Sequence, residues 1–373
     1  MKWEKMKIIH VVPKPPFHGG LETIAGELCE QLVSKGHDVI WYCLNKSLDH
    51  KSRKSLRKGV LIKEFKPLIE DPLYIPSRDF VIELRGEEAD IIHIHNLHTL
   101  LPLLALLFKK NHSARNVLQP HYHAQGQSYI RDTAFHLYTK LLKLAVLPNF
   151  SAVVVNSKYE QTVFAKDFPE VVQKVVLIPE EYSIEIPGNI KWNPIECPRK
   201  ILYVGALKKY KNVDALIKAF KILVPKISNF ELTIVGKGTQ KEELLKLADD
   251  IGVSGSIVWK SDLAYDELIR EYAEASVVVH LSELESFSRV VHEAMAIGTP
   301  ILVYEYGALG ALSRGGLAKG VKNLNPVNIA VAIETVIKDG WQQKPLDFQV
   351  KGETYVGSIE KLYQNILQSQ ISS

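Results

Sequence analysis

Two glutamates lie eight residues apart in the segment Ser282–Pro300, SELESFSRVVHEAMAIGTP. The segment follows a predicted strand, Val277–His280, and opens a predicted helix, so Glu285 falls in the connecting loop and Glu293 inside the helix. A carboxylate at that place can accept hydrogen bonds from both neighbouring hydroxyls of a ribose. The backbone amides of Phe287–Val290, free at the helix start, can hold a phosphate or a sugar hydroxyl. A solvated helix face also produces this spacing, so the two glutamates alone do not decide the function.

A lysine and two histidines follow other predicted strands. Lys211 lies in the loop after the predicted strand Ile201–Val204, where a compact ammonium can bind a phosphate. His121 and His123 come directly after the predicted strand Val117–Gln119. In an extended segment these two histidines point to opposite sides, so spacing does not choose between them, and both can be ordinary polar loop residues.

Glycine pairs and a histidine-rich strand complete the candidate sites. Gly19 and Gly20 occupy the first strand-to-helix turn, where glycine permits close backbone approach and a helix start offers donors to a phosphate, although an ordinary tight turn also explains them. The Gly-Lys-Gly at 236–238 resembles a dinucleotide fingerprint, but Lys241 stands at its third position, which argues against an oxidoreductase. The segment Asp90–His95 ends a strand, and we expect its two histidines to be buried with satisfied hydrogen bonds.

The elements that position these residues alternate between short apolar strands and amphipathic helices, which indicates an α/β fold of doubly wound parallel sheets. We expect an N-terminal domain at 1–180, a proline-rich linker at 181–198 and a C-terminal domain at 199–354. A final helix at 355–373 is expected to pack back on the first domain. Two such halves leave a cleft between the carboxyl ends of their strands, where ligands bind.

Composition excludes several classes of protein. The chain has 373 residues, a net charge of +4, and 46% hydrophobic and 24% charged residues, which fits a globular protein and not a disordered chain or a nucleic-acid-binding domain. No apolar run reaches the roughly 18 residues that span a bilayer, and Leu97–Phe108 is predicted to be a buried helix. Three widely spaced cysteines indicate free thiols in a reducing compartment. We therefore expect a cytoplasmic protein.

Two segments allow contact with the inner face of a membrane. The lysines and arginines between Lys46 and Lys66 form either a solvated loop or a surface that meets anionic headgroups. The segment Arg131–Leu147 mixes leucines with basic residues, so it either packs on its own sheet or rests on a membrane.

The complete pattern S-x2-E-S-F-…-E-A-M-A-x-G-T-P closely resembles the Glu-x7-Glu signature of the family-4 retaining glycosyltransferases, which have the GT-B fold. The resemblance extends to Gly-Gly-x-Glu at 19–22, Asp-x-x-His-x-His at 90–95 and the lysine at 211. It implies that Glu285 lies against the donor sugar, that Glu293 binds the ribose, and that His121 lies near the reacting sugar carbon. It also implies that the remaining donor contacts come from the two glycines of the first turn, the diphosphate-binding lysine and the amides between the glutamates: Gly19, Gly20, Lys211, Phe287, Ser288, Arg289 and Val290.

The sequence departs from the family pattern in four segments. Ser288 replaces the usual glycine after the phenylalanine, and Ala206 replaces an arginine that normally faces the diphosphate. Glu180-Glu181 stands where Asn-Gly is usual, and Ala311 stands where a glutamate is common. Lys208, Lys209 or Arg289 could supply the charge lost at position 206.

The resemblance implies a retaining hexosyltransferase that moves a sugar from a nucleotide-diphosphate sugar to the hydroxyl of a sugar or glycolipid. His121, Glu285 and Lys211 are its candidate catalytic residues. The sequence has no Asp-x-Asp at a strand end and no metal-ligand spacing, so we expect neither a metal nor a cofactor. The alternatives are a non-catalytic nucleotide-sugar-binding scaffold, favoured by Ala206, and a nucleotide-sugar epimerase of the same fold.

Overall fold

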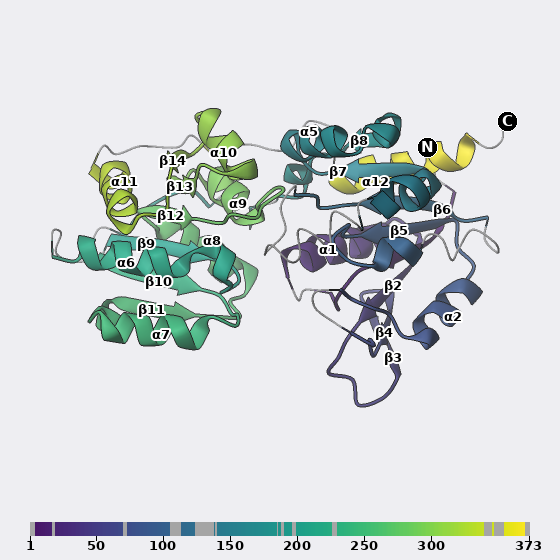
Figure 1. The fold of residues 1–373 in the computed structure, drawn as a ribbon, viewed down its shortest axis with the longest axis horizontal. Helices are drawn as coiled ribbons and strands as arrows, with labels where there is room; N and C mark the ends of the chain where they lie inside the picture. Colours follow the sequence, from purple (N-terminus) through teal and green to yellow (C-terminus); the bar gives the residue numbers. More distant parts are fainter. Residues whose placement is uncertain are drawn as a thin grey trace. The chain divides into compact units, whose positions relative to one another are not determined.

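The computed structural model divides the chain into two compact units, residues Met1–Ser183 with Lys351–Ser373, and residues Ile184–Val350 (Figure 1). The described residues are 4–16, 19–69, 73–104, 113–123, 138, 140–184, 186–187, 190–195, 199–225, 230–338, 345–346 and 354–369. In that part of the chain, no helix combines the length and the apolar character needed to cross a membrane. Cys29 and Cys43 are buried free thiols.

The N-terminal unit contains an eight-stranded sheet of order β3-β4-β2-β1-β5-β6-β7-β8. All its neighbouring strands are parallel except the antiparallel pair β3 and β4. The strands are β1 (Lys7–Val11), β2 (Asp38–Leu44), β3 (Ser52–Arg57), β4 (Val60–Phe65), β5 (Ile91–His95), β6 (Arg115–Gln119), β7 (Ala152–Val155) and β8 (Val175–Leu177). The longer helices are α1 (Gly20–Ser34), α2 (Arg78–Gly86), α5 (Lys158–Asp167) and α12 (Tyr355–Gln368).

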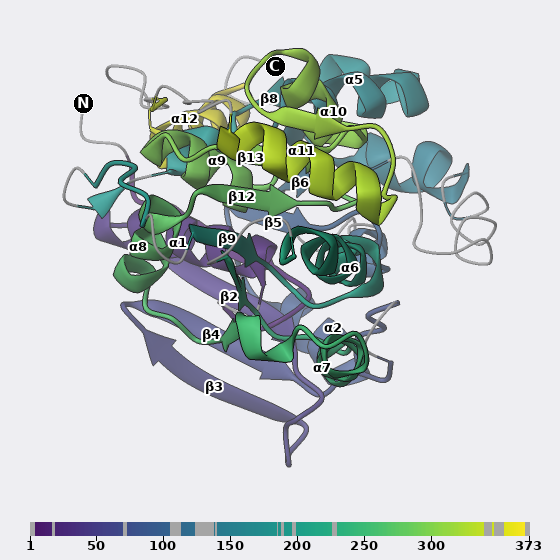
Figure 2. The ribbon, with the colours of Figure 1, turned by 90° about the vertical axis from the view of Figure 1, so that its left-hand side faces the viewer.

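The C-terminal unit contains a six-stranded parallel sheet of order β11-β10-β9-β12-β13-β14 (Figure 1). Figure 2 shows β9, β12 and β13 of this sheet from another side. Its strands are β9 (Arg199–Val204), β10 (Phe230–Val235), β11 (Ile257–Lys260), β12 (Val277–His280), β13 (Ile301–Tyr304) and β14 (Lys319–Val321). Its helices are α6 (Val213–Leu223), α7 (Lys241–Asp250), α8 (Tyr265–Glu274), α9 (Arg289–Ile297), α10 (Gly307–Arg314) and α11 (Pro326–Lys338).

Helices cover both faces of each sheet because successive strand residues point to opposite sides. In β9, Ile201 and Tyr203 pack in one core with α6, α7 and α11, while Leu202 and Val204 pack in another with α8, α9 and α10. Both faces of the strand are therefore apolar, as the sequence pattern predicts. The expected α/β class with two doubly wound sheets is confirmed.

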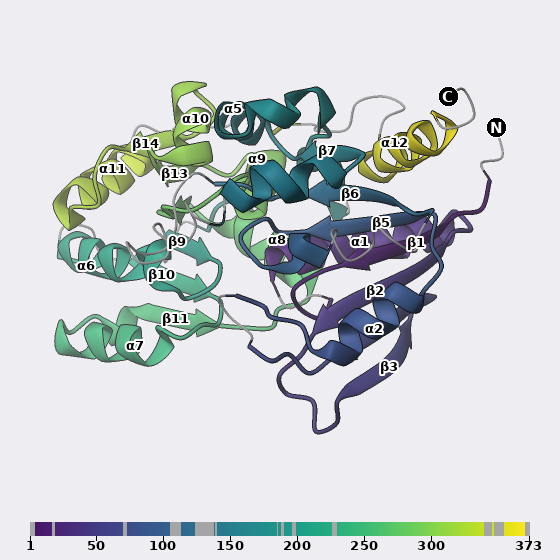
Figure 3. The same ribbon diagram turned by 45° about the vertical axis from the view of Figure 1, so that its right-hand side comes forward.

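The basic run between Lys46 and Lys66 contains a β-hairpin, so its interpretation as a loop is wrong. Strands β3 and β4 pair through this region, and Figure 3 shows β3 at the edge of the sheet. The side chain of Lys63 is buried and forms ion pairs with Glu87 and, at 2.9 Å, with Glu83. Burial alone would lower the pKa of Lys63, but these carboxylates raise it above its ordinary value. Because a lysine occupies a buried position of β4, the sequence there lacks the apolar pattern that would predict a strand.

Two predicted helices lie only partly within the described residues. Of Leu97–Phe108, the described part forms turns and a 3₁₀ helix at Leu101–Leu103, so the helix does not begin at residue 97. Of Arg131–Leu147, the described part includes a π-helix at Leu142–Val146, in which Leu142 is buried and Leu144 is 84% exposed. The rest of both segments lies outside the described residues.

Helix α12 belongs to the N-terminal unit. The hydroxyl of Tyr355 accepts a 2.7 Å hydrogen bond from Gln119 Nε2, and Tyr363 contacts His93 Nδ1 at 2.6 Å. The carboxylate of Glu360 contacts His37 Nε2 at 2.9 Å. Polar contacts therefore join this helix to β5, to β6 and to the residue directly before β2. In the segment before β9, by contrast, Trp192 N–H donates to Ile297 in the C-terminal unit at 3.1 Å.

Candidate active site

The loops after β9 and β12 meet because these strands are neighbours in the C-terminal sheet. Asn212 Nδ2 donates to the carbonyl of Leu281 at 3.0 Å, and Glu283 N–H donates to the carbonyl of Tyr210 at 3.0 Å. These bonds bring Lys211 Nζ into an ion pair with Glu285 Oε1. Two candidate residues from separate motifs therefore lie together.

The carboxylate of Glu285 is held in its ionised form. Its side chain is 15% exposed, and His280 Nε2 contacts Oε1 at 2.9 Å beside the Lys211 ammonium. Burial acts to raise the pKa of Glu285, but the charge of Lys211 and the hydrogen bond from His280 leave it well below its ordinary value. An anionic ligand that binds Lys211 has to share this ammonium with Glu285.

Helix α9 carries Glu293 into the interior, where the side chain is 4% exposed. Arg289 Nε donates to Oε1 at 2.8 Å and the Tyr272 hydroxyl donates to Oε2 at 3.0 Å. Because Arg289 pairs with the glutamate four residues later, it does not act in this structure as the replacement for the arginine missing at the exposed Ala206. Lys209, another candidate, extends toward Asp214 at 3.7 Å.

The Gly-Lys-Gly at 236–238 has a packing role. A Cβ atom on Gly236 would lie far inside van der Waals contact with the Gly205 carbonyl oxygen, and one on Gly238 would do the same with that of Leu207. Two backbone hydrogen bonds hold the loops this close. The N–H of Gly205 donates to the Val235 carbonyl at 3.0 Å, and the N–H of Leu207 donates to the Lys237 carbonyl at 2.8 Å. These glycines let the loop after β10 support the loop that carries Lys211.

We expect Gly236→Ala to lower the free energy of unfolding by about 3 kcal/mol, because the backbone has to move to admit the methyl group. Gly255→Ala is the matched control, since a Cβ there meets nothing within 4 Å. Chemical denaturation of both variants measures the difference, and equal stabilities would contradict this packing role.

In the N-terminal unit, Gly19 precedes α1 and a Cβ there would lie 2.5 Å from Glu22 Oε2. The Glu22 carboxylate therefore lies close to the start of the helix where we expected a phosphate. A Cβ on Gly20 meets nothing within 4 Å. The contact at Gly19 is with the far end of a flexible side chain, which can move aside, so packing alone does not require glycine at position 19.

His121 has a φ of 47°, so the expectation that residues 121–123 are extended is wrong at this residue. Its Nδ1 lies 3.1 Å from Asn156 Nδ2, whose amide oxygen accepts from Gln119 Nε2 at 2.7 Å. This arrangement makes Nδ1 the acceptor and leaves the proton on Nε2. His123 instead stacks on His98, with ring centroids 3.9 Å apart. The two histidines therefore have different surroundings.

Asn156 and Glu160 are residues that sequence reasoning missed. Glu160 accepts from the backbone N–H of Tyr122 at 2.5 Å and of Asn156 at 2.8 Å, which ties the His121 loop to the end of β7. Burial raises the pKa of Glu160 to about 7. The sequence signal for this site was Asn156, a polar residue directly after an apolar strand, as at the other candidate positions.

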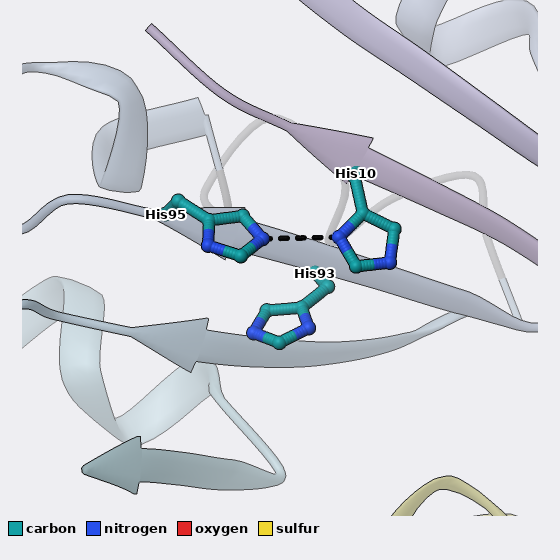
Figure 4. Close-up of side chains that lie close together, drawn as sticks. All are labelled: His10, His93 and His95. Carbon is teal, nitrogen blue, oxygen red and sulfur yellow. Dashed lines mark hydrogen bonds between the residues drawn. The ribbon is translucent and has the colours of Figure 1, made fainter. Parts of the chain in front are cut away.

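His10, His93 and His95 form a buried cluster at β1 and β5 (Figure 4). One nitrogen from each lies within 4.8 Å of the others, a separation that allows metal binding. However, His10 Nδ1 and His95 Nε2 form a 3.0 Å hydrogen bond with each other. Metal-bound histidines normally donate their second N–H, whereas His10 Nε2 and His95 Nδ1 have no partner among the described residues. The cluster therefore fits hydrogen-bonded neutral imidazoles better than a metal site.

The expectation that His93 and His95 are buried holds, but not that all their hydrogen bonds are satisfied. His93 Nε2 and His95 Nδ1 lack a partner among the described residues. Burial lowers the pKa of both histidines well below the ordinary value, so they are neutral near pH 7.

Comparison with solved structures identifies the fold as GT-B. Sucrose-phosphate synthase from Thermosynechococcus elongatus superimposes with a TM-score of 0.68 and 17% identity over 99% of this chain and 98% of that one. An Anabaena protein, HepE, in complex with UDP-glucose gives a TM-score of 0.68 and 17% identity over 99% of this chain and all of that chain.

The two halves of the chain also match named domain families. Residues 18–180 match Glycosyltransferase Family 4 and residues 189–352 match Glycosyl transferases group 1. An uncharacterized glycosyltransferase of Methanocaldococcus jannaschii is 27% identical over 87% of each chain. A D-inositol 3-phosphate glycosyltransferase of Acidothermus cellulolyticus is 24% identical over 80% of this chain and 73% of its own. The chain therefore carries a glycosyltransferase family 4 domain followed by a glycosyltransferase group 1 domain.

Proposed function

We propose that this protein is a retaining glycosyltransferase that moves a hexose from a nucleoside-diphosphate sugar to a hydroxyl of a sugar or glycolipid, without a metal. The observation that carries the proposal is the arrangement at one edge of the C-terminal sheet. There the Lys211–Glu285 ion pair, whose side chains are 12% and 15% exposed, lies in the loops after β9 and β12, and the buried Glu293 lies in α9, which follows β12. The relatives' names, and the UDP-glucose bound to the Anabaena neighbour, support a nucleotide-sugar donor.

Each residue has a distinct proposed role. Lys211 and the amides at the start of α9 stabilise the negative charge that grows on the departing diphosphate, and such preorganised contacts lower the barrier most when the charge develops. Glu293 accepts from the ribose hydroxyls. Glu285 orients the donor sugar, and the departing phosphate assists in taking the proton from the acceptor hydroxyl. Gly19 and Gly20 allow the backbone to approach the donor.

His121 is proposed to orient and polarise the sugar and not to act as a base. Burial lowers the pKa of His121 to about 4, so its imidazole is neutral near pH 7. Its Nδ1 faces Asn156, and its Nε2 has no partner among the described residues. That N–H is a donor suited to a sugar oxygen.

Incubation of the full chain with UDP-, GDP- and ADP-sugars tests the proposal. We expect slow release of the nucleotide from one donor, faster with the correct acceptor, and a product that keeps the anomeric configuration of the donor by NMR. An altered sugar without nucleotide release would indicate an epimerase, and binding without turnover would indicate a scaffold. Either result would contradict the proposed transferase.

A further inference from the structure

Ser288 has a backbone conformation that disfavours a side chain. Its φ of 88° and ψ of 87° lie at positive φ, where residues other than glycine are uncommon. Strain of this kind persists only where the surrounding structure imposes it, and it clusters at sites that bind ligands. We therefore expect contacts that impose this backbone conformation and a ligand that it would serve.

The local cause is His292, one turn along α9. Its backbone N–H at 3.3 Å and its Nδ1 at 2.9 Å both contact the Ser288 carbonyl oxygen. Its ring stacks on Phe287, with centroids 3.9 Å apart and planes 15° apart. Burial lowers the pKa of His292 to about 4, so the ring is neutral and Nδ1 carries the proton toward the carbonyl. These contacts hold the strained backbone without using the serine hydroxyl.

The hydroxyl of Ser288 is unsatisfied. The residue is 7% exposed, and Oγ has no hydrogen-bond partner among the described residues. Although Ser288 occupies the N-cap position of α9, its side chain does not cap the helix. No described hydrogen bond uses the backbone N–H of Val290 or Val291. A buried hydroxyl without a partner is costly, and here it lies beside helix amides that favour an anion.

We propose that Ser288 Oγ donates a hydrogen bond to a phosphate oxygen of an anion bound at the amino end of α9. The inference rests on the proposed function, which places the donor diphosphate there. The backbone amides alone would serve this purpose with glycine, the residue that the family pattern usually has at this position. The serine adds a side-chain contact and makes this chain more selective for a ligand whose phosphate reaches Oγ.

Two substitutions separate the hydroxyl from the strain. Ser288→Ala removes Oγ and keeps Cβ, whereas Ser288→Gly removes both. Calorimetric titration of the full chain with UDP, GDP, ADP and inorganic pyrophosphate should show Kd raised about tenfold in both variants, as expected for one hydrogen bond to a charged group. Ser288→Gly alone should also raise Tm by about 2–4 °C, because the strain is relieved. Lys58→Gly, at a φ of 44° in the N-terminal unit, is the control whose Kd should not change.

The outcomes distinguish this inference from the proposed function. If both Ser288 variants bind as tightly as the wild type, the inference is wrong and the proposed function stands. If the wild type binds pyrophosphate but no nucleotide, the proposed function fails and the pyrophosphate series decides the role of Ser288. If the wild type binds neither ligand, both are overturned.

Discussion

Lys211→Ala is expected to lower kcat about a hundredfold, because it removes a preorganised charge from the departing diphosphate and such a contact contributes about 3 kcal/mol to the barrier. The same substitution leaves Glu285 buried beside His280 without its ammonium partner. Removing one member of a buried ion pair costs about 3–5 kcal/mol of stability, so unfolding has to be measured together with turnover.

Two further variants separate the catalytic effect from the structural one. Glu285 is itself a candidate catalytic residue, so Lys211→Ala/Glu285→Gln is used for stability, which it should largely restore, and not to recover activity. Lys209→Ala removes a side chain that is 77% exposed on the same short turn and should change neither quantity. A kcat of Lys211→Ala within a factor of two of the wild type would contradict the role of the Lys211 ammonium in stabilising the departing diphosphate.

Acid is expected to destabilise the N-terminal unit from about pH 6.5 downward. Burial depresses the folded-state pKa of its histidines, to about 3 for His10 and about 4 for His121, against 6.5 when unfolded. Below pH 6.5 the unfolded chain therefore binds protons that the folded chain does not. The free energy of unfolding thus decreases as the pH decreases. Each such histidine lowers the free energy of unfolding by about 1 kcal/mol when the pH drops from 7 to 5.5. Five described histidines of this unit share the shift: His10, His93, His95, His98 and His121.

One carboxyl group opposes this trend. Because burial raises the pKa of Glu160 to about 7, the folded chain protonates this carboxylate at a higher pH than the unfolded chain does. This uptake stabilises the folded state in acid and offsets the destabilisation from about one histidine. Denaturant unfolding from pH 7 to 5.5 measures the sum. His10→Asn should reduce the loss by about 1 kcal/mol, while the exposed control His50→Asn should not change it. A flat profile across this range would contradict the neutral buried cluster.

The positions at the edge of the C-terminal sheet were predictable because parallel strands present their following loops at one edge. Lys211 and Glu285 are 74 residues apart, yet the strand pattern alone places both after strands, and the sheet order makes β9 and β12 neighbours. The strand Val277–His280 was predicted with its observed bounds because its apolar run is unbroken.

Other features depend on contacts between distant residues that no local pattern reports. The hairpin of β3 and β4 was missed because Lys63 is buried among carboxylates contributed by α2 and the residue after it. Beside the left-handed backbone of His121, the His121 ring contacts Asn156 and the N–H of Tyr122 donates to Glu160, and both partners come from beyond the next strand. In the sequence, Ser288 stands out only as a departure from the family pattern, whereas the structure shows backbone strain and a hydroxyl with no partner among the described residues.

A crystal structure of the full chain soaked with nucleotide sugars would show which side chains bind the donor. We expect a nucleoside diphosphate whose ribose hydroxyls donate to Glu293 and whose phosphates contact Lys211 and the amides at the start of α9. A bound nucleotide that leaves Glu293 in contact only with protein groups such as Tyr272 and Arg289 would contradict this expectation.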